Sequence, residues 1–277
     1  MVALVRRLTG EKRVGHAGTL DPEASGVLPI CLGQGTRVAE FLSAAPKVYQ
    51  ADIELGIVTT TYDATGEITK VGDASSLSLE QVERALTRFR GEIEQIPPMY
   101  SAVKRRGRPL YKLARVGMEV ARKPRKVEVF RLEILRWENP FLAIEVECGK
   151  GTYIRSLAHD LGQVLGCGAC LKKLVRLQSG PFRLEGAVSP EELEEAFRQG
   201  YGQTYLHPLD VALSHLDAAI VSDGDKKAII AGQSLALAGV EGKFCRAYSA
   251  EGKLLAVLHF QPDRGLWHPE KVFAEGL

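Results

Sequence analysis

Close to its N-terminus the sequence contains the loop Gly15-His16-Ala17-Gly18-Thr19-Leu20-Asp21-Pro22, which follows a basic amphipathic stretch and precedes an apolar run. Its two glycines permit backbone turns, or a close approach by another chain segment, that other residues resist. Pro22 disfavours the helical region for Asp21, so we expect an extended or turn backbone there, with the carboxylate projecting. Two interpretations are open: an ordinary turn with a hydrogen-bonded carboxylate, or a nucleophile or general base on a rigid loop.

The segments beside this loop predict short elements. Residues 2–9 place their apolar side chains on one face of a helix and two arginines off it. Residues 26–33 are apolar and bounded by glycines, which indicates a buried strand, and residues 36–43 indicate a short helix.

Tyr49 opens the most regular strand pattern in the chain. Tyr49, Ala51, Ile53 and Leu55 alternate with polar residues, which predicts a half-buried strand. Tyr49 is on the inward face near one end, a position that suits a core ring and equally a ring that lines a cleft.

Periodicity predicts further elements up to residue 177. They are a polar loop at 63–76, a helix at 79–89 after a capping box at Ser78, a hairpin of strands at 127–137 and 142–148, a helix at 154–165 ended by Gly166, and a helical or strand segment at 171–177. Arg155 is in the first turn of its helix, where the helix dipole slightly disfavours a cation. This indicates either a specific use for the guanidinium or an ordinary surface arginine.

Residues 104–126 carry ten basic side chains and one acid, Glu119, although the net charge of the whole chain is only +2. Tyr100 and Tyr111 lie within or beside this stretch, and glycines mark it as an excursion from regular structure. A charge run is often a solvated face, but a dense run of one sign with aromatic residues is typical of phosphate binding. We therefore expect residues 98–126 to form an insertion that grips RNA. Its candidate backbone contacts are Lys104, Arg105, Arg106, Arg108 and Lys112.

The composition of the 277 residues is that of a globular protein, with 45% hydrophobic and 25% charged residues. We find neither an apolar run long enough to span a bilayer nor a secretory leader, so we expect a cytoplasmic protein without a membrane association. Five cysteines, three of them single and two in the one pair Cys167–Cys170, argue against a disulfide framework. One C-x-x-C pair without a second is insufficient for a structural zinc site, and we expect reduced, packed thiols and no metal.

The sequence pattern changes in the last part of the chain. Residues 200–210 resemble a linker, and from about Ser214 a short helix and short strands at 244–248 and 254–260 predict a small β-rich module. We therefore expect a catalytic domain over residues 1–213 and a second domain over residues 214–277.

Several motifs resemble, in order, those of the bacterial tRNA pseudouridine-55 synthase family of the TruB type. They are the opening loop continued through Gly26-Val-Leu-Pro-Ile-Cys-Leu-Gly33, Tyr49-Gln-Ala51, Pro98-Met-Tyr-Ser-Ala102, Lys150-Gly-Thr-Tyr-Ile-Arg155 and Leu165-Gly-Cys-Gly-Ala169. The end of the chain, Trp267-His-Pro-Glu-Lys-Val-Phe273, resembles that family's C-terminal PUA domain. The resemblance implies an α+β pseudouridine-synthase fold, with a large mixed, mainly antiparallel sheet and flanking helices, plus a small β-rich PUA pseudobarrel.

The resemblance implies an isomerase that converts uridine 55 in the TΨC arm of tRNA to pseudouridine without metal or cofactor. Asp21 then matches the nucleophile, which attacks ribose C1′ or base C6 or abstracts a ribose proton. Tyr49 matches the ring that stacks on the target base, and Arg155 the partner of the catalytic carboxylate. His16 matches the side chain that occupies the RNA beside the flipped nucleotide, and Tyr153 and Leu174 match pocket-wall positions. We expect tRNA as the partner and a monomer without an obligate protein partner.

One departure from the family concerns the N-terminus. The family opens with a strand and a Lys-Pro-x-Gly motif before the first helix, and we expect both to be missing here, because the sequence starts inside that helix. An alternative function is therefore a non-catalytic tRNA-binding or folding-assistant protein with a truncated active domain. A more remote alternative is a hydrolase with Asp21 as nucleophile.

Overall fold

The computed structural model describes residues 1–105 and 107–273, and the chain divides into two compact units. We call them the sheet unit (Leu20–Val27 and Ala44–Glu185) and the terminal unit (Met1–Thr19, Leu28–Ser43 and Gly186–Leu277). The chain passes from one unit to the other within the N-terminal loop. The expected domain boundary at residue 214 falls inside the terminal unit and stays a prediction.

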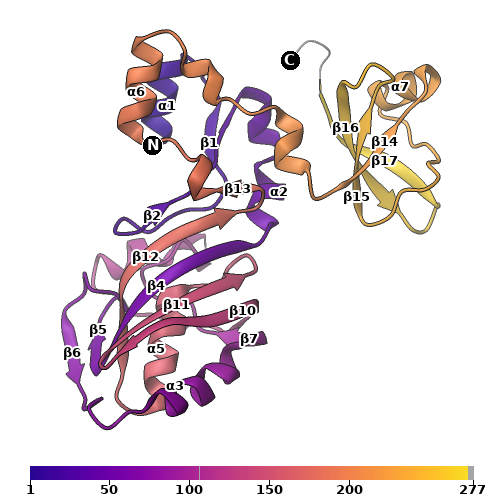
Figure 1. Ribbon diagram of the computed structural model, residues 1–277. Helices are drawn as coiled ribbons and strands as arrows, with labels where there is room; N and C mark the ends of the chain where they lie inside the picture. Colours follow the sequence, from indigo (N-terminus) through magenta and orange to yellow (C-terminus); the bar gives the residue numbers. More distant parts are fainter. Residues whose placement is uncertain (106, 274–277) are drawn as a thin grey trace. The chain divides into compact units, whose positions relative to one another are not determined.

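The sheet unit is built on one large sheet (Figure 1). Its strands, in spatial order, are β13 (Phe182–Arg183), β12 (Ala169–Ser179), β4 (Lys47–Leu55), β11 (Phe141–Cys148), β10 (Arg125–Glu138) and β7 (Gly91–Gln95). All of these neighbours pair antiparallel, while the short β2 (Ser25–Gly26) pairs parallel with β12. The α+β class with a mainly antiparallel sheet is confirmed.

Strand β4 is an inner strand of this sheet, and its alternating pattern supplies one apolar face. Ala51, Ile53 and Leu55 are at most 2% exposed and belong to the main core. Tyr49 packs against the same core and pairs with Arg176 of β12. The strand predicted from alternation is confirmed, with its start two residues earlier.

Two helices, α3 (Leu79–Leu86) and α5 (Ile154–Leu165), cover one face of the sheet (Figure 1). Helix α3 begins at the predicted capping box, in which Ser78 and Gln81 exchange hydrogen bonds. Helix α5 ends at Gly166, whose φ of 81° is left-handed. Gly162 lets α5 approach β12 closely, because an added Cβ would lie 2.1 Å from the Ala169 nitrogen.

Two segments differ from their predicted form, and the structure decides between the alternatives for a third. Residues 26–33 do not form one strand: Ser25–Gly26 pairs in the sheet unit, whereas β3 (Ile30–Leu32) pairs with β1 (Val14–His16) in the terminal unit. The 63–76 loop contains β6 (Ile68–Val71), which pairs with β5 (Ile57–Thr59). Residues 171–177, open between helix and strand, belong to β12.

The terminal unit contains helices from both ends of the chain and a four-stranded sheet. The helices are α1 (Val2–Thr9), α2 (Ala39–Ala44), α6 (Pro190–Arg198) and α7 (Asp223–Ile230). The strands are β14 (Asp217–Ile220), β15 (Phe244–Tyr248), β16 (Leu254–Gln261) and β17 (Leu266–Val272), paired in that order. This sheet has its own core, which includes Leu258 and Trp267, so the predicted β-rich C-terminal region is confirmed.

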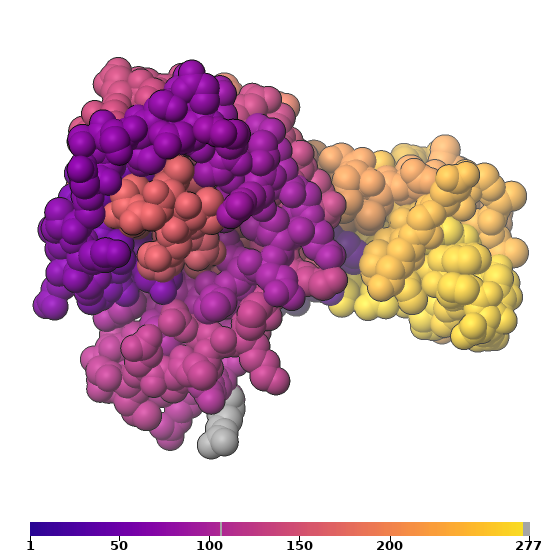
Figure 2. Space-filling model, turned by 90° about the horizontal axis from the view of Figure 1, so that it is seen from below, coloured from indigo at the N-terminus to yellow at the C-terminus, as the bar shows by residue number. Residues whose placement is uncertain are grey.

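The basic segment, residues 104–126, is partly ordered by local structure. It contains the small hairpin β8 (Lys104–Arg105) and β9 (Arg108–Pro109) and the short helix α4 (Leu110–Ala114), anchored by the buried Leu110. Figure 2 shows magenta residues of this region projecting from the body of the sheet unit. Nowhere in residues 1–105 and 107–273 is a helix both long and apolar enough to span a membrane.

Candidate active site

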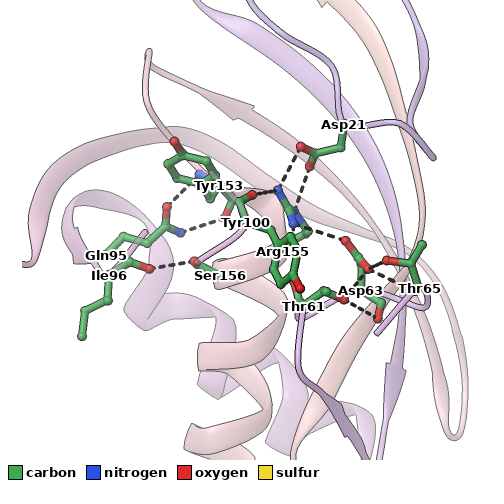
Figure 3. A network of polar contacts seen from close by, with 10 residues as sticks. All are labelled: Asp21, Thr61, Asp63, Thr65, Gln95, Ile96, Tyr100, Tyr153, Arg155 and Ser156. Carbon is green, nitrogen blue, oxygen red and sulfur yellow. Dashed lines mark hydrogen bonds and ion pairs between the residues drawn. The ribbon is translucent and has the colours of Figure 1, made fainter. Parts of the chain in front are cut away.

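Arg155 is the centre of a polar network in the sheet unit (Figure 3). Its side chain is only 5% exposed, so the ordinary surface arginine that the sequence left open is excluded. Its Nη2 donates to Asp21 Oδ1 at 2.9 Å, and its Nε lies 2.8 Å from Asp21 Oδ2. The planar guanidinium therefore meets both carboxylate oxygens of Asp21, which fixes the orientation of that carboxylate.

The backbone holds Asp21 at this place through the short strand that follows it. Ala24 donates its N–H to the Asp21 carbonyl, and Ser25–Gly26 then pairs with β12. Gly26 is required there, because its φ is 104° and an added Cβ would lie 2.2 Å from the Arg176 carbonyl oxygen. The Asp21 side chain remains 37% exposed, so the carboxylate is both oriented and accessible.

Asp63 is a second carboxylate on the same arginine. Its Oδ2 lies 3.3 Å from Arg155 Nη1, and its side chain is 17% exposed. Its Oδ1 accepts hydrogen bonds from the Thr61 hydroxyl and from the backbone N–H and hydroxyl of Thr65. These bonds fix Asp63 within the turn between β5 and β6 (Figure 3).

Backbone carbonyls complete the surroundings of the guanidinium. Arg155 Nη2 donates to the Tyr100 carbonyl at 2.8 Å, and Nη1 lies 3.5 Å from the Thr61 carbonyl. The buried cation thus has two carboxylates and two carbonyls around it, an arrangement that compensates for its loss of water.

Helix α5, which carries Arg155, is fixed at its start by side chains of a neighbouring segment. The Gln95 side chain accepts from the Tyr153 N–H and donates to the Tyr153 carbonyl, and Ser156 donates to the Ile96 carbonyl (Figure 3). The two Gln95 bonds satisfy backbone groups of Tyr153 at the helix start, where Tyr153 provides no side-chain cap. Arg155 is therefore presented from a rigid element.

Opposing effects set the pKa of Asp21. Burial raises it above its ordinary value, Arg155 lowers it, and the nearby charge of Asp63 raises it, with a net increase. The carboxylate accordingly takes up its proton at a higher pH than a free aspartate. The group can act as a nucleophile or base only above that pKa.

Tyr49 lies at the start of β4, with its ring against the core. Burial raises the pKa of its hydroxyl, whereas the Arg176 guanidinium, which is hydrogen-bonded to it, lowers that pKa. The negative charge of Asp21 also raises the pKa of Tyr49, with a smaller effect than burial or Arg176.

The other predicted site residues are in different environments. Tyr153 directly precedes α5, and Leu174 lies in β12 and is 8% exposed within the core. His16 is exposed at the end of β1 in the terminal unit. The structure thus groups Asp21, Arg155, Tyr49 and Tyr153 in one unit, and the roles of all these residues stay predictions.

Most of the predicted RNA-backbone residues are exposed. Lys104, Arg105, Arg108 and Lys112 all have exposed side chains, and Arg105 donates to the Ala121 carbonyl. Arg106 lies outside the described residues. In the described part of the chain, no three His, Cys, Asp or Glu side chains form a group able to hold a metal ion.

Asp63 is the residue of this network that the sequence did not reveal. Its one local signal is the spacing Thr61-x-Asp63-x-Thr65, which suits an aspartate that organises its own turn. Nothing in that pattern connects it with an arginine 92 residues away.

Comparisons with known proteins cover nearly the whole chain. Residues 6–154 match the family described as TruB family pseudouridylate synthase (N terminal domain), and residues 155–219 match the tRNA pseudouridylate synthase B C-terminal domain. The tRNA pseudouridine synthase B of Dehalococcoides mccartyi is 46% identical over 99% of this chain and 91% of its own length. That of Listeria welshimeri is 42% identical over 97% and 91%.

Among solved structures, a Cbf5-Nop10-Gar1 complex contains a chain with a TM-score of 0.77 and 28% identity. The match covers 99% of this chain and 80% of the other. A chain in a structure of an H/ACA RNP bound to a substrate RNA containing 2'-deoxyuridine matches with a TM-score of 0.74 and 25% identity, with the same coverage.

Proposed function

Because the chain belongs to the TruB family of pseudouridine synthases, an isomerase family, we propose that its target is uridine 55 in the TΨC arm of tRNA. Its relatives are named as synthases that act on tRNA, which supports uridine isomerisation in tRNA as the reaction. The oriented, accessible carboxylate of Asp21 beside a buried arginine carries the proposal. In this reaction the N1–C1′ bond breaks and a C5–C1′ bond forms, while C5 loses a proton and N1 gains one.

Asp21 starts this reaction as an ionised carboxylate. Attack on C1′, attack on C6 and abstraction of a ribose proton all require the charged form. Arg155 supports that form and orients it through two contacts. Because the pKa of Asp21 is raised overall, kcat decreases as the pH falls through that pKa.

Access to the base requires that the nucleotide leave its stack. Flipping costs a few kcal/mol, and stacking on an aromatic ring returns about 1–3 kcal/mol. We assign this ring to Tyr49, which packs against the core near the start of β4. We assign His16 to the RNA position beside the flipped nucleotide, and Tyr153 and Leu174 to the pocket wall.

Two parts of the chain supply the remaining RNA contacts in this proposal. The exposed cations Lys104, Arg105, Arg108 and Lys112 bind phosphates of the arm. Residues 214–277 act as a PUA-like RNA-binding domain, supported by their four-stranded sheet with a core of its own.

Tritium release from a tRNA transcript labelled at C5 of uridine tests the function. We expect one tritium per tRNA, none from a transcript with cytidine at position 55, and no free uracil. Binding without tritium release would support the non-catalytic alternative. Free uracil would instead indicate a hydrolase, and release that persists with cytidine 55 would refute the assigned position.

A further inference from the structure

Tyr62 has an unusual backbone conformation next to the arginine network. Among the described non-glycine residues it is the one with a positive φ, of 65°. A left-handed backbone is costly for a bulky side chain, and such conformations persist where the surroundings enforce them. The residues on both sides of Tyr62 contact Arg155, Thr61 through its carbonyl and Asp63 through its carboxylate.

The Tyr62 ring is stacked on the imidazole of His159. The ring centroids are 3.9 Å apart and the planes differ by 16°. His159 lies one turn after Arg155 on α5, so the stack connects the strained turn to the helix that presents the guanidinium. On the backbone side, the Tyr62 carbonyl accepts from Leu171 of β12, and Ala64 donates to the Leu171 carbonyl.

The surroundings of His159 favour the neutral ring. Its pKa is lowered by burial and by the positive charge of Arg122, and its Nδ1 is buried without a hydrogen-bond partner. At neutral pH the imidazole in the stack is thus uncharged. It positions the turn without adding charge beside Arg155.

We propose that Tyr62 and His159 are positioning residues, whose ring stack holds the strained turn so that Thr61 and Asp63 fix Arg155 against Asp21. The inference rests on the proposed function of Asp21. Without the stack, the turn is no longer held against α5 through the Tyr62 ring, Asp63 moves from the guanidinium, and the two contacts from Arg155 to Asp21 loosen.

The test compares substitutions that keep a ring with substitutions that remove it. Tyr62→Phe and His159→Phe retain the stack, so kcat is expected near the wild-type value. Tyr62→Ala and His159→Ala remove it and lower kcat about 10- to 100-fold, the effect of small displacements in an active site, with KM for tRNA unchanged. The double Ala variant loses no more than the worse single variant, because both substitutions abolish the same ring stack.

A titration separates positioning from general destabilisation. Arg155 lowers the pKa of Asp21 by more than the nearby charge of Asp63 raises it. Loosening both groups therefore lets that pKa rise, and the acid limb of the kcat–pH profile moves to higher pH in both Ala variants. Carbon-13 NMR of the Asp21 carboxyl, assigned by its absence in Asp21→Asn, measures the same shift without substrate. This second measurement stands even if wild-type protein fails to release tritium, which would refute only the proposed function.

Tyr62→Gly is a second variant for the case that Tyr62→Ala does not fold. Glycine adopts the positive φ freely, and the substitution still removes the ring. We expect a folded protein with the kcat loss and pKa rise of Tyr62→Ala. An unchanged Asp21 pKa and kcat in folded Tyr62→Gly and His159→Ala would overturn the inference. A loss in Tyr62→Phe as large as in Tyr62→Ala would overturn it too, because it would assign the effect to the hydroxyl.

Discussion

Arg155 shows how one buried side chain can organise a reactive carboxylate. Its guanidinium divides its donors between Asp21, Asp63 and two backbone carbonyls. A lysine has the same charge but no planar fork, so it cannot contact both oxygens of Asp21 and also reach Asp63. The site therefore depends on the planar shape of the Arg155 guanidinium as well as on its charge.

Arg155→Lys accordingly should retain tRNA binding and lower kcat about 100-fold, comparable to the loss of one oriented donor in an active site. Steady-state tritium release measures kcat and KM separately. Arg90→Lys is the matched control, since Arg90 donates to the Leu132 carbonyl away from this network. Wild-type kcat in Arg155→Lys would contradict the role assigned to the fork.

Asp160, also on α5, gives a prediction about stability. Burial raises its pKa to about 6 from 3.8, so the folded state disfavours the charged form. The associated stability is present below the unfolded-state pKa and is lost as the pH rises through about 6. Asp160→Asn therefore increases the free energy of unfolding at pH 7 by at most about 3 kcal/mol, an upper limit because the side chain is half-buried.

Urea denaturation followed by circular dichroism, at pH 7 and again well below the unfolded-state pKa of 3.8, measures this difference. We expect the advantage of the Asn variant to disappear at the lower pH, where the aspartate is neutral in both states. A variant less stable than wild type at pH 7 would show that the carboxylate has a favourable partner.

At the scale of the element, local sequence pattern predicted those segments whose form depends on their own residues. The alternation after Tyr49 predicted β4, and the Ser78 capping box and Gly166 marked the start of α3 and the end of α5. Residues 171–177 were ambiguous because pairing with β4, a long-range interaction, makes them a strand. The prediction of a single strand over residues 26–33 was wrong, because Gly26 pairs with β12 whereas Ile30 pairs with β1.

The candidate site was predictable to a similar extent. Asp21, Tyr49 and Arg155 were selected on motifs, and the structure shows the ion pair between the first and the last. Asp63 and the Tyr62–His159 stack were not predicted, because they join a turn to a helix that is remote in sequence. Interactions of this kind leave no periodic signal.

The basic segment is the element whose predicted role is most easily measured. Neutralising Arg105 and Arg108 to Gln removes two exposed cations. We expect weaker tRNA binding, and a plot of log K against log salt whose slope is reduced by about 0.7–0.9 for each phosphate that the protein no longer neutralises.

The control removes the same charge elsewhere in the sheet unit. Arg84→Gln with Arg88→Gln changes exposed residues of α3 and the turn after it, and we expect the salt slope to stay as in wild type. Equal slopes for wild type and the Arg105/Arg108 variant, measured by filter binding, would rule out phosphate binding by these two arginines.

At the scale of the whole molecule, we propose that tRNA binding and chemistry are separable, and that the chemistry depends on Asp21. Asp21 is a single carboxylate, whereas many cationic side chains are available to bind RNA. We therefore expect its neutralisation to affect the reaction and not tRNA binding. Burial disfavours the charged carboxylate of Asp21. We therefore expect the melting temperature of Asp21→Asn to equal or exceed that of wild type.

The most direct test is tritium release by Asp21→Asn beside wild type on the same C5-labelled tRNA, together with filter binding of both proteins. We expect stoichiometric release by wild type, none by Asp21→Asn, and equal tRNA binding. Release by Asp21→Asn at the wild-type rate would contradict the role of Asp21 in the reaction.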